Sequence, residues 1–386
     1  MFSARLHWDL RPNPLTELLR SKRQAGANVL DLTESNPTAA GILYPDDEIL
    51  GALADARSLR YEPSPAGLAS AREAIAYDYY APRGVNVDPS NILLTASTSE
   101  AYGYVMKLLA NPGDQLLVPR PSYPLFDFLA AFESVRVTHY PLVYDDGWSI
   151  DIDALAGAIT DRTRAVALVN PNNPAGSFLK RPELDRLIAI CRERDLAIVS
   201  DEVFSDYAFG PDAQRVEHLA ETGGVVTFRL SGLSKVAGLP QMKLAWIVTE
   251  SAPAMERLEL IADTYLSVAT PVQHAAPALL RAGDRIREQI RGRTRRNLDT
   301  LRACTANSVN RTLHVEGGWC ATVQAPLVRS GEEWALELLD RRDVLVQPGY
   351  LYDFDREALL VFSLLTPEEK FKEGVTRFSE YVAGVV

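Results

Sequence analysis

Short apolar runs alternate with amphipathic stretches through most of the chain. Helical spacing is present at 66–80, after the Pro63–Ser64–Pro65 break, and again at 99–110 and 181–194. The apolar runs predict short buried strands at 91–95, 115–118, 164–170, 196–200, 225–230 and 244–248. Strands that are buried on both faces and alternate with helices indicate an α/β fold with a mostly parallel sheet.

The pattern changes near residue 285, where a long charged helical stretch begins. A helix near 332–342 and strands near 344–346 and 359–364 follow it. We therefore expect three parts: an arm with part of the small domain at 1–45, a large domain at 46–285, and a smaller α+β domain at 286–386. The length of 386 residues suits this division, at roughly 150 residues per domain.

The net charge narrows the range of partners. Forty Lys and Arg residues stand against 51 Asp and Glu residues, which gives a formal charge of −11. An acidic chain is repelled by nucleic acid and by anionic lipid, so neither is expected as a partner. The sequence has no apolar run long enough for a membrane span, and its first residues lack the apolar core of a signal peptide.

Cysteine and histidine usage points to the same kind of protein. Cys191, Cys304 and Cys320 are far apart and form no Cys-x-x-Cys pair. That spacing argues against a disulfide framework and fits a reducing, cytoplasmic location. The five histidines are scattered, so we expect no metal site.

Polar segments follow four of the predicted strands, at 95–100, 170–176, 200–202 and 231–235. In a parallel sheet the carboxyl ends of the strands share one edge, and ligands bind there. The four segments are therefore expected to form one site.

Two residues in these segments carry the candidate chemistry. Lys235 follows a strand, and a lysine in a partly dry pocket can lose its proton and form a Schiff base, although a solvated loop lysine is commoner. Asp201 ends an apolar run, where a carboxylate needs a cationic partner; the alternative is a helix N-cap. The two Asn-Pro steps in Asn170–Gly176 make a rigid polar turn or a plain loop.

Taken in order, these segments resemble the fold type I pyridoxal-phosphate enzymes, and specifically the class I/II aminotransferase family, over about residues 30–370. The resemblance implies an aspartate-aminotransferase-like fold with pyridoxal 5′-phosphate bound to Lys235 as an aldimine (a Schiff base). It assigns Asp201 to the pyridinium nitrogen and Asn173 to the ring hydroxyl. The implied reaction moves an amino group between an amino acid, or a related amine, and a keto acid.

The same resemblance implies further cofactor contacts. Thr98 and Ser99 would lie under the phosphate, where backbone N–H groups at a helix start bind anions, although an ordinary N-cap uses the same residue types. Tyr123 would stack on the ring, and Tyr61 would reach the phosphate of the neighbouring subunit, which requires a homodimer. The remaining implied contacts are Phe204, Ser234 and Lys243. Trp319 and Tyr350 would line the substrate side or belong to the core.

Three positions depart from the family pattern around the cofactor. Phe204 stands where a tyrosine is usual, so one hydroxyl contact is lost. Gly232 stands where a phosphate-binding serine is usual, with Ser231 one residue earlier. Lys243 replaces an arginine and keeps the charge without the planar fork.

A fourth departure concerns the substrate. Val361 stands where the family has an arginine for the substrate α-carboxylate, and no arginine lies between Arg356 and Arg377. Either another group holds the carboxylate or the substrate is not a standard α-amino acid. Candidate replacements lie on the arm, at Arg20, Lys22 and Arg23.

Two other functions remain open from the sequence. A lyase or cyclase would use the same cofactor, because elimination, replacement and cyclisation begin with removal of the same α-proton. A ligand-binding regulator is a third hypothesis. Residues 1–45 are too few for a DNA-binding module, the chain is acidic, and both Lys235 and Asp201 are present, all of which disfavour it.

Overall fold

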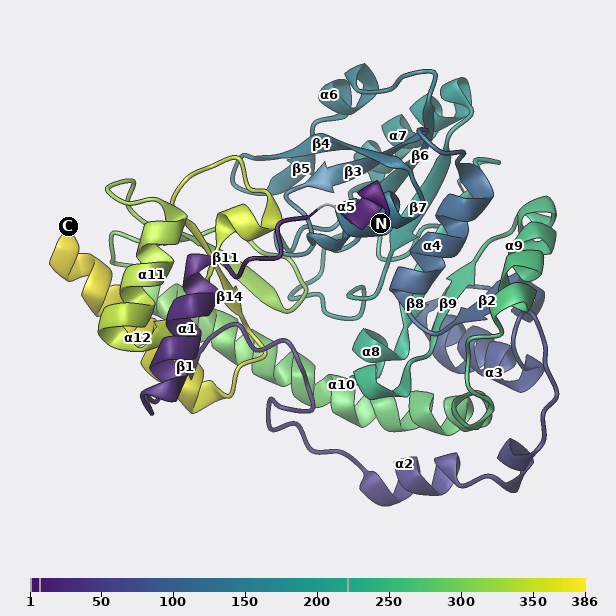
Figure 1. Cartoon of the computed structure of the whole chain (residues 1–386), viewed down its shortest axis with the longest axis horizontal. Helices are drawn as coiled ribbons and strands as arrows, with labels where there is room; N and C mark the ends of the chain where they lie inside the picture. The colour runs from purple at the N-terminus through teal and green to yellow at the C-terminus, as the bar shows by residue number, and fades with distance from the viewer. Residues whose placement is uncertain (1, 7, 221) are drawn as a thin grey trace.

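The computed structural model describes residues 2–6, 8–220 and 222–386, and contains a large sheet beside a smaller one (Figure 1). The large sheet has eight strands in the order β2-β9-β8-β7-β6-β3-β4-β5. Only β9 and β5 run antiparallel to their neighbours, which confirms a mostly parallel α/β sheet. The strands are β2 (Ile92–Thr95), β3 (Gln115–Arg120), β4 (Arg136–Tyr144), β5 (Trp148–Ile150), β6 (Thr163–Val169), β7 (Ala197–Asp201), β8 (Thr227–Gly232) and β9 (Ala245–Val248).

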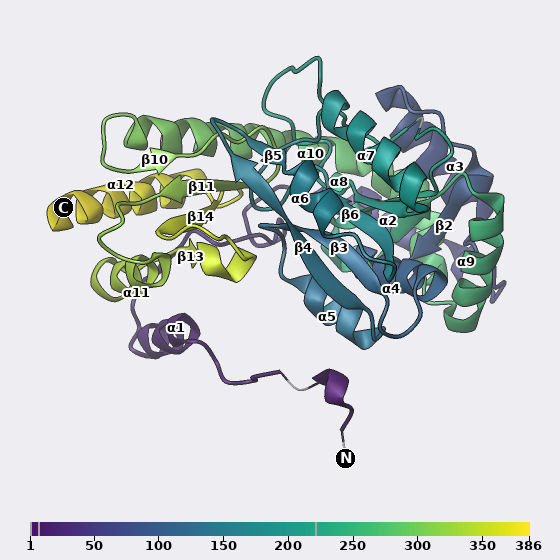
Figure 2. The same ribbon diagram turned by 90° about the horizontal axis from the view of Figure 1, so that it is seen from above.

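Helices cover both faces of this sheet (Figure 2). Both faces are apolar, because successive side chains of the central strands point into two different apolar clusters. In β6, Ala165 and Ala167 face one cluster, while Val166 and Leu168 face the other. The first face packs against α4 (Thr98–Leu109), α5 (Leu125–Phe132) and α9 (Ala252–Tyr265). The second packs against α3 (Ala69–Ala74), α6 (Ile152–Gly157), α7 (Arg181–Arg194), α8 (Leu233–Val236) and α10 (Thr270–Thr305).

The smaller sheet has four strands in the order β10-β11-β14-β13, all antiparallel. The strands are β10 (Arg311–Thr312), β11 (Cys320–Gln324), β13 (Gln347–Pro348) and β14 (Leu359–Ser363). Its core is closed by α1 (Pro14–Gln24), α11 (Gly331–Arg342), α12 (Glu368–Val385) and the end of α10. A short parallel pair, β1 (Leu30–Asp31) with β12 (Val344–Leu345), joins the arm to this part.

One long helix, α10, connects the two sheets and runs along the lower side of the view in Figure 1. It passes continuously through residues 285 and 286, where the sequence pattern placed a domain boundary. Gly283 lets it approach the large part closely, since a Cβ atom there would lie 2.5 Å from Ala237 Cβ. The remaining elements are α2 (Asp46–Leu53), a π-helix η3 (Ile75–Tyr80), and the 3-10 turns η1 (Ala4–Leu6), η2 (Ala56–Leu59), η4 (Ala81–Arg83), η5 (Pro89–Asn91), η6 (Pro240–Met242) and η7 (Gly349–Tyr352).

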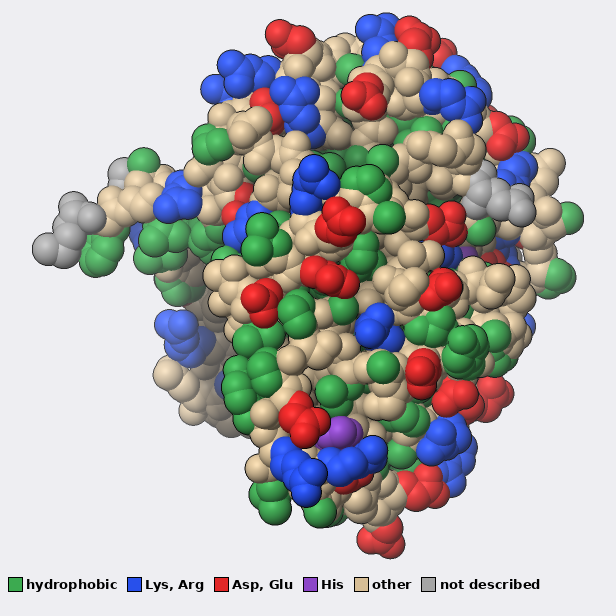
Figure 3. Space-filling view, turned by 90° about the vertical axis from the view of Figure 1, so that its right-hand side faces the viewer, with side chains coloured by type: hydrophobic (Ala, Val, Ile, Leu, Met, Phe, Trp, Pro, Cys, Tyr) green, Lys and Arg blue, Asp and Glu red, His purple; other side chains and the backbone are tan. Residues whose placement is uncertain are grey.

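The surface at the α9 end of the molecule mixes acidic, basic and apolar side chains (Figure 3). No helix in the described part of the chain is both long and apolar enough to cross a bilayer.

Candidate active site

The four polar segments predicted to share one edge of the sheet do so. Strands β2, β6, β7 and β8 are parallel to one another, so their carboxyl ends lie at the same edge. The Asn170 N–H donates to the Asp201 carbonyl at 2.8 Å, and the Glu202 N–H donates to the Leu230 carbonyl at 2.8 Å. These bonds hold the Asn-Pro loop, the Asp201 segment and the end of β8 side by side.

Lys235 lies in the short helix α8, directly after β8. Backbone contacts hold this helix from two sides: the Tyr207 hydroxyl donates to the Lys235 carbonyl at 2.6 Å, and the Arg287 guanidinium donates to the Val236 carbonyl at 2.8 Å. Gly238 then turns the chain with a φ of +62°, and a Cβ there would lie 2.6 Å from Ile286 Cγ2. The close packing of α10 therefore fixes where the Lys235 side chain begins.

The Lys235 ammonium lies among aromatic rings. Its Nζ is 4.7 Å from the centre of the Trp319 ring and 5.5 Å from that of Phe204. Trp319 also packs edge-to-face on Phe204 and Tyr207, with ring centres 5.3 Å and 5.2 Å away. Burial lowers the pKa of Lys235, and the nearby Cys320 and Asp201 offset part of that effect. A neutral, nucleophilic amine is thus easier to reach than on an exposed lysine.

Asp201, the last residue of β7, is largely shielded from solvent. Burial raises the pKa of its carboxyl group to about 6, against hydrogen bonds and the Lys235 charge, which lower it. The Tyr102 hydroxyl donates to Oδ2 at 3.3 Å, and the Val203 N–H donates to Oδ1 at 3.2 Å. The Val203 bond closes a turn and caps no helix, so the N-cap alternative for Asp201 is wrong. Asp201 forms no ion pair within the described part of the chain.

The start of α4 offers donors for an anion. Ser97 is the N-cap, and its Oγ accepts from the Glu100 N–H at 3.1 Å. The N–H groups of Thr98 and Ser99, in the first turn, have no acceptor among the described residues. Lys243 is exposed and follows η6 with a left-handed φ of 52°. Backbone donors at the start of α4 and one exposed lysine are thus the groups offered here to an anion.

The packing explains why position 232 is glycine. A Cβ atom on Gly232 would lie 2.7 Å from Ala245 Cβ, on the neighbouring strand β9. A serine there would collide with the sheet. Ser231 is fully buried, and its hydroxyl has no hydrogen-bond partner among the described residues. Ser234, in α8 beside Lys235, is the half-buried hydroxyl of this segment.

The Asn-Pro loop contains two asparagine side chains that hold the backbone in place and one that does not. Asn170 and Asn172 bond the backbone of the loop and of its neighbours, including the Asn172 amide to the Pro121 carbonyl at 3.1 Å. The half-buried Asn173 side chain has no hydrogen-bond partner in the described part of the chain, which leaves it free for a ligand. The same Pro121 bond places the segment of Tyr123, a ring 47% exposed, against this loop.

Two predicted residues lie apart from Lys235 within one chain. Tyr61 is 78% exposed, in the segment that leads to α3. Tyr350 is exposed too, and its hydroxyl donates to Glu332 at 3.3 Å on α11. Trp319, by contrast, is only 3% exposed and faces Lys235, so it belongs both to the core and to the site.

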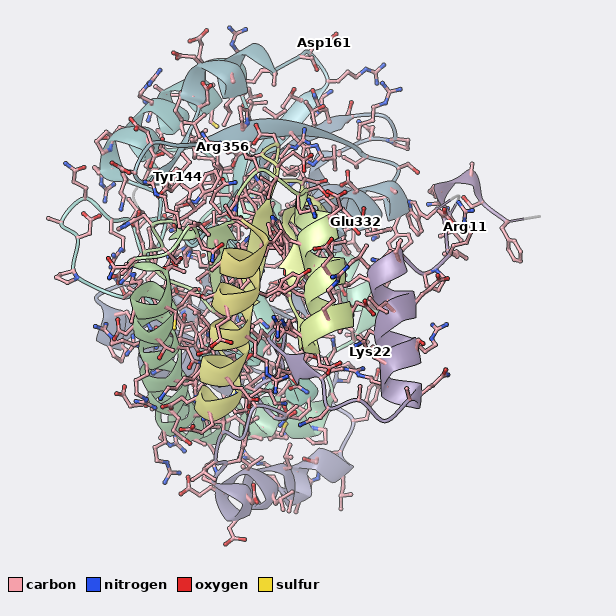
Figure 4. The ribbon with its side chains drawn as sticks, turned by 90° about the vertical axis from the view of Figure 1, so that its left-hand side faces the viewer. Arg11, Lys22, Tyr144, Asp161, Glu332 and Arg356 are labelled. Atoms are coloured by element: carbon pink, nitrogen blue, oxygen red, sulfur yellow. The ribbon has the colours of Figure 1, made fainter. Side chains whose placement is uncertain are left out.

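The arm does not supply the substrate cation that the sequence suggested. Lys22 pairs with Asp343 at 2.9 Å and Arg23 with Asp31 at 3.3 Å, while Arg20 is exposed on α1. Figure 4 shows Lys22 on α1, beside the smaller sheet. Val361 lies in β14 and is buried, so the valine at this position is not a surface substitution.

Several site residues were missed from the sequence. Tyr102 lies four positions after Thr98, and that spacing on one helix face was the available signal for its approach to Asp201. Tyr207 and Cys320 gave no local signal, because they come near Lys235 only through the tertiary fold. Tyr352 adjoins Cys320, which contributes to raising its pKa above the usual value, after burial as the main cause.

The site residues fit pyridoxal 5′-phosphate. This group requires donors and acceptors of four kinds, and the chain has them: a partly buried lysine with a lowered pKa, a partly buried carboxyl group, N–H groups at a helix start without an acceptor among the described residues, and an amide without a partner there. The family model for aminotransferase class I and II matches residues 27–378. The chain belongs to the class I and II aminotransferase family.

Individual relatives agree with this assignment. The glutamate-pyruvate aminotransferase AlaA of Escherichia coli K12 is 30% identical over 278 residues, which cover 71% of this chain and 68% of that protein. Mouse tyrosine aminotransferase is 29% identical over 256 residues, 62% of this chain and 56% of that protein. The structure of an alanine aminotransferase from Pyrococcus furiosus superposes with a TM-score of 0.88 at 25% identity and covers 99% of both chains.

The protein is therefore a pyridoxal-phosphate-dependent aminotransferase of fold type I. The named relatives are aminotransferases, so a lyase or cyclase acting through the same cofactor is not favoured. The family assignment by itself does not give the role of each site residue or the substrate.

Proposed function

We propose that Lys235 is the residue that holds the cofactor and moves the proton during amino transfer. Its support is the position of Nζ between Trp319 and Phe204, where burial lowers the amine pKa. A neutral amine can attack a carbonyl carbon and can accept the α-proton of a bound substrate, then return it to the cofactor side. When bound, pyridoxal phosphate supplies the electron sink that stabilises the resulting negative charge.

The other side chains of the site would orient the cofactor and polarise its ring. Asp201 would hold a proton at the ring nitrogen, and the bond from Tyr102 orients its carboxyl group. Asn173 would donate to the ring hydroxyl, and Tyr123 would cover the ring. The N–H and hydroxyl groups of Thr98 and Ser99 would bind the phosphate. Ser234 and Lys243 would complete the phosphate contacts, while Phe204 packs beside Lys235 and provides no hydroxyl.

The test is a comparison of purified wild type with Lys235→Ala. Wild type is expected to show the visible absorbance of covalently held cofactor, and an amino donor should convert it to the amine form. The variant should lose this band, and its amino transfer rate should fall at least ~10³-fold. Lys370→Ala, an exposed lysine on α12, is the matched control and should behave as wild type. An unchanged band and rate in Lys235→Ala would rule out the assignment.

The relatives named above suggest small amino acids and keto acids as the substrate range to screen first. We also propose a homodimer in which Tyr61 reaches the phosphate of the other subunit. Its support is an aromatic side chain 78% exposed on a single chain, in a segment with Pro63 and Pro65. Sedimentation at micromolar concentration tests it, and a monomer would refute it.

Two coarser features complete the proposal. A cytoplasmic location is supported by the three unpaired cysteines. The division into an arm (1–45), a large cofactor-binding part (46–285) and a small part (286–386) is supported by the two sheets, with α10 shared between the last two.

A further inference from the structure

One face of the smaller sheet is turned toward Lys235. Residues directly opposite each other on antiparallel strands point to the same side, so the pairings Cys320–Ser363, Thr322–Val361 and Gln347–Val361 define one face. Leu360 and Phe362, on the other face, fill the core beneath α11 and α12. Val361 instead joins the cluster of the large part. That cluster includes Leu142, Trp148, Tyr352 and Phe354.

This face meets the catalytic lysine at the start of β11. Trp319, just before that strand, has its ring centre 4.7 Å from Lys235 Nζ. The thiol of Cys320 interacts electrostatically with Lys235: the ammonium opposes the rise that burial causes in the pKa of Cys320. Tyr352 extends the same wall, since its hydroxyl donates to Gln347. A substrate bound at Lys235 is therefore bordered by this wall.

The wall is electrically neutral. Its polar groups are the thiol of Cys320, the buried Thr322 hydroxyl, which has no partner among the described residues, and the amide of Gln347. Besides burial, the groups that act on the pKa of Lys235 are Cys320 and Asp201, and neither is a cation.

The arginines that flank β14 in the sequence are engaged elsewhere. Arg356 donates to the Tyr144 carbonyl at 3.3 Å and lies over the Tyr144 ring (Figure 4). Arg377 donates to the Arg342 carbonyl at 2.9 Å. The Ser363 hydroxyl is engaged as well, because its Oγ donates to the backbone carbonyl of Glu34. Among the described residues, this face of the smaller sheet therefore supplies no counter-charge to a negative group on the substrate.

Burying a carboxylate without a cation is far less favourable than burying a neutral group of the same size. On the basis of the proposed role of Lys235, we propose that the β14 wall selects amino donors without a free carboxylate beside the reacting carbon. The favoured donors are uncharged apart from the reacting amine: primary amines and amino-acid amides with apolar or aromatic side chains. Val361 is the residue that determines this preference.

The chemistry needs no extra reagent. The C–H bond of the amine carbon breaks, and that carbon is oxidised by two electrons to an aldehyde or ketone. The bound cofactor is reduced by the same two electrons and keeps the amino group, while water supplies the carbonyl oxygen of the product. The Lys235 amine carries the proton.

The experiment compares three donors with one side chain: 2-phenylethylamine, L-phenylalaninamide and L-phenylalanine. Each is mixed with holoenzyme in a single half-reaction, and conversion of the cofactor to its amine form is followed by absorbance. The two donors without a carboxylate should show kcat/KM at least roughly tenfold higher than the free acid, mainly through KM. Equal or faster reaction of L-phenylalanine overturns the inference while the proposed role of Lys235 stands. If no donor reacts, both fail.

A variant tests the residue itself. Val361→Arg should raise kcat/KM for L-phenylalanine and lower it for 2-phenylethylamine, whereas Val361→Ile, which adds volume without charge, should leave their ratio unchanged. Because Val361 is only 1% exposed, placing an arginine there carries a desolvation cost that can prevent folding. The three-donor comparison on wild type decides the inference in that event, and an unchanged ratio in a folded Val361→Arg protein overturns the role of Val361.

Discussion

Asp201, the proposed partner of the ring nitrogen, lowers the stability of the cofactor-free fold when it is ionised. Burial raises the pKa of its carboxyl group from 3.8 to about 6 in the cofactor-free chain. The folded value lies above the unfolded one, so ionised Asp201 destabilises the fold above about pH 6, and the penalty declines as the pH falls toward 4. A shift of about two units corresponds to a penalty of about 3 kcal/mol at pH 8 and about 1.5 kcal/mol at pH 5.

Asp201→Asn removes this titration with little change in shape. The assay is urea unfolding of the cofactor-free protein at pH 8 and at pH 5, with the free energy of unfolding extrapolated to water. The stability of the variant relative to wild type should fall by about 1.5 kcal/mol between pH 8 and pH 5. Added cofactor should then stabilise wild type more than the variant, because the protonated ring nitrogen supplies the missing cation.

The control is Asp161→Asn, an exposed carboxyl group labelled at the upper edge of Figure 4, which precedes β6 and so lies at the opposite end of the parallel strands from Asp201. It should show no such difference between the two pH values. A relative stability of Asp201→Asn that is the same at pH 8 and pH 5 would refute the reasoning, because the pKa of Asp201 would then not be raised in the folded chain.

Two further substitutions test how Lys235 is positioned. Gly232→Ser places a Cβ 2.7 Å from Ala245 Cβ and should cost about 1–3 kcal/mol in urea unfolding, whereas Gly157→Ser, with open space around it, should stay within about 0.5 kcal/mol of wild type. A stable Gly232→Ser protein with tighter cofactor binding would contradict the steric explanation. Tyr207→Phe removes the hydroxyl that donates to the Lys235 carbonyl; it should cost about 1–3 kcal/mol and shift the pH at which the absorbance of bound cofactor changes. The exposed Tyr77→Phe is its control, and an unshifted pH midpoint in Tyr207→Phe would argue against a positioning role.

Elements with a simple local pattern were predictable from the sequence. The helix predicted at 181–194 coincides with α7, since leucine and isoleucine recur on one face between polar residues. The central strands were predictable because burial on both faces demands continuous apolar runs. Strand β4 was not predicted: it contains Pro141 and mixes polar with apolar residues, and its pairing with β3 and β5 depends on distant segments. The predicted helix at 66–80 ends as a π-helix, which local spacing does not distinguish.

The candidate site divides in the same way. Lys235, Asp201 and Asn173 follow strands in motifs that the sequence displays directly, so their residue types and shared edge could be inferred. The sequence does not show the protonation state of Lys235, because that depends on burial between Phe204, which follows β7, and Trp319, which precedes β11. Likewise, the hydrogen bond to the Lys235 carbonyl and the neutral wall at Val361 arise from contacts between segments far apart in the chain. The residue types of the site are set by local sequence motifs. The protonation state of Lys235 and the proposed donor selectivity depend on desolvation, which only the packed tertiary structure determines.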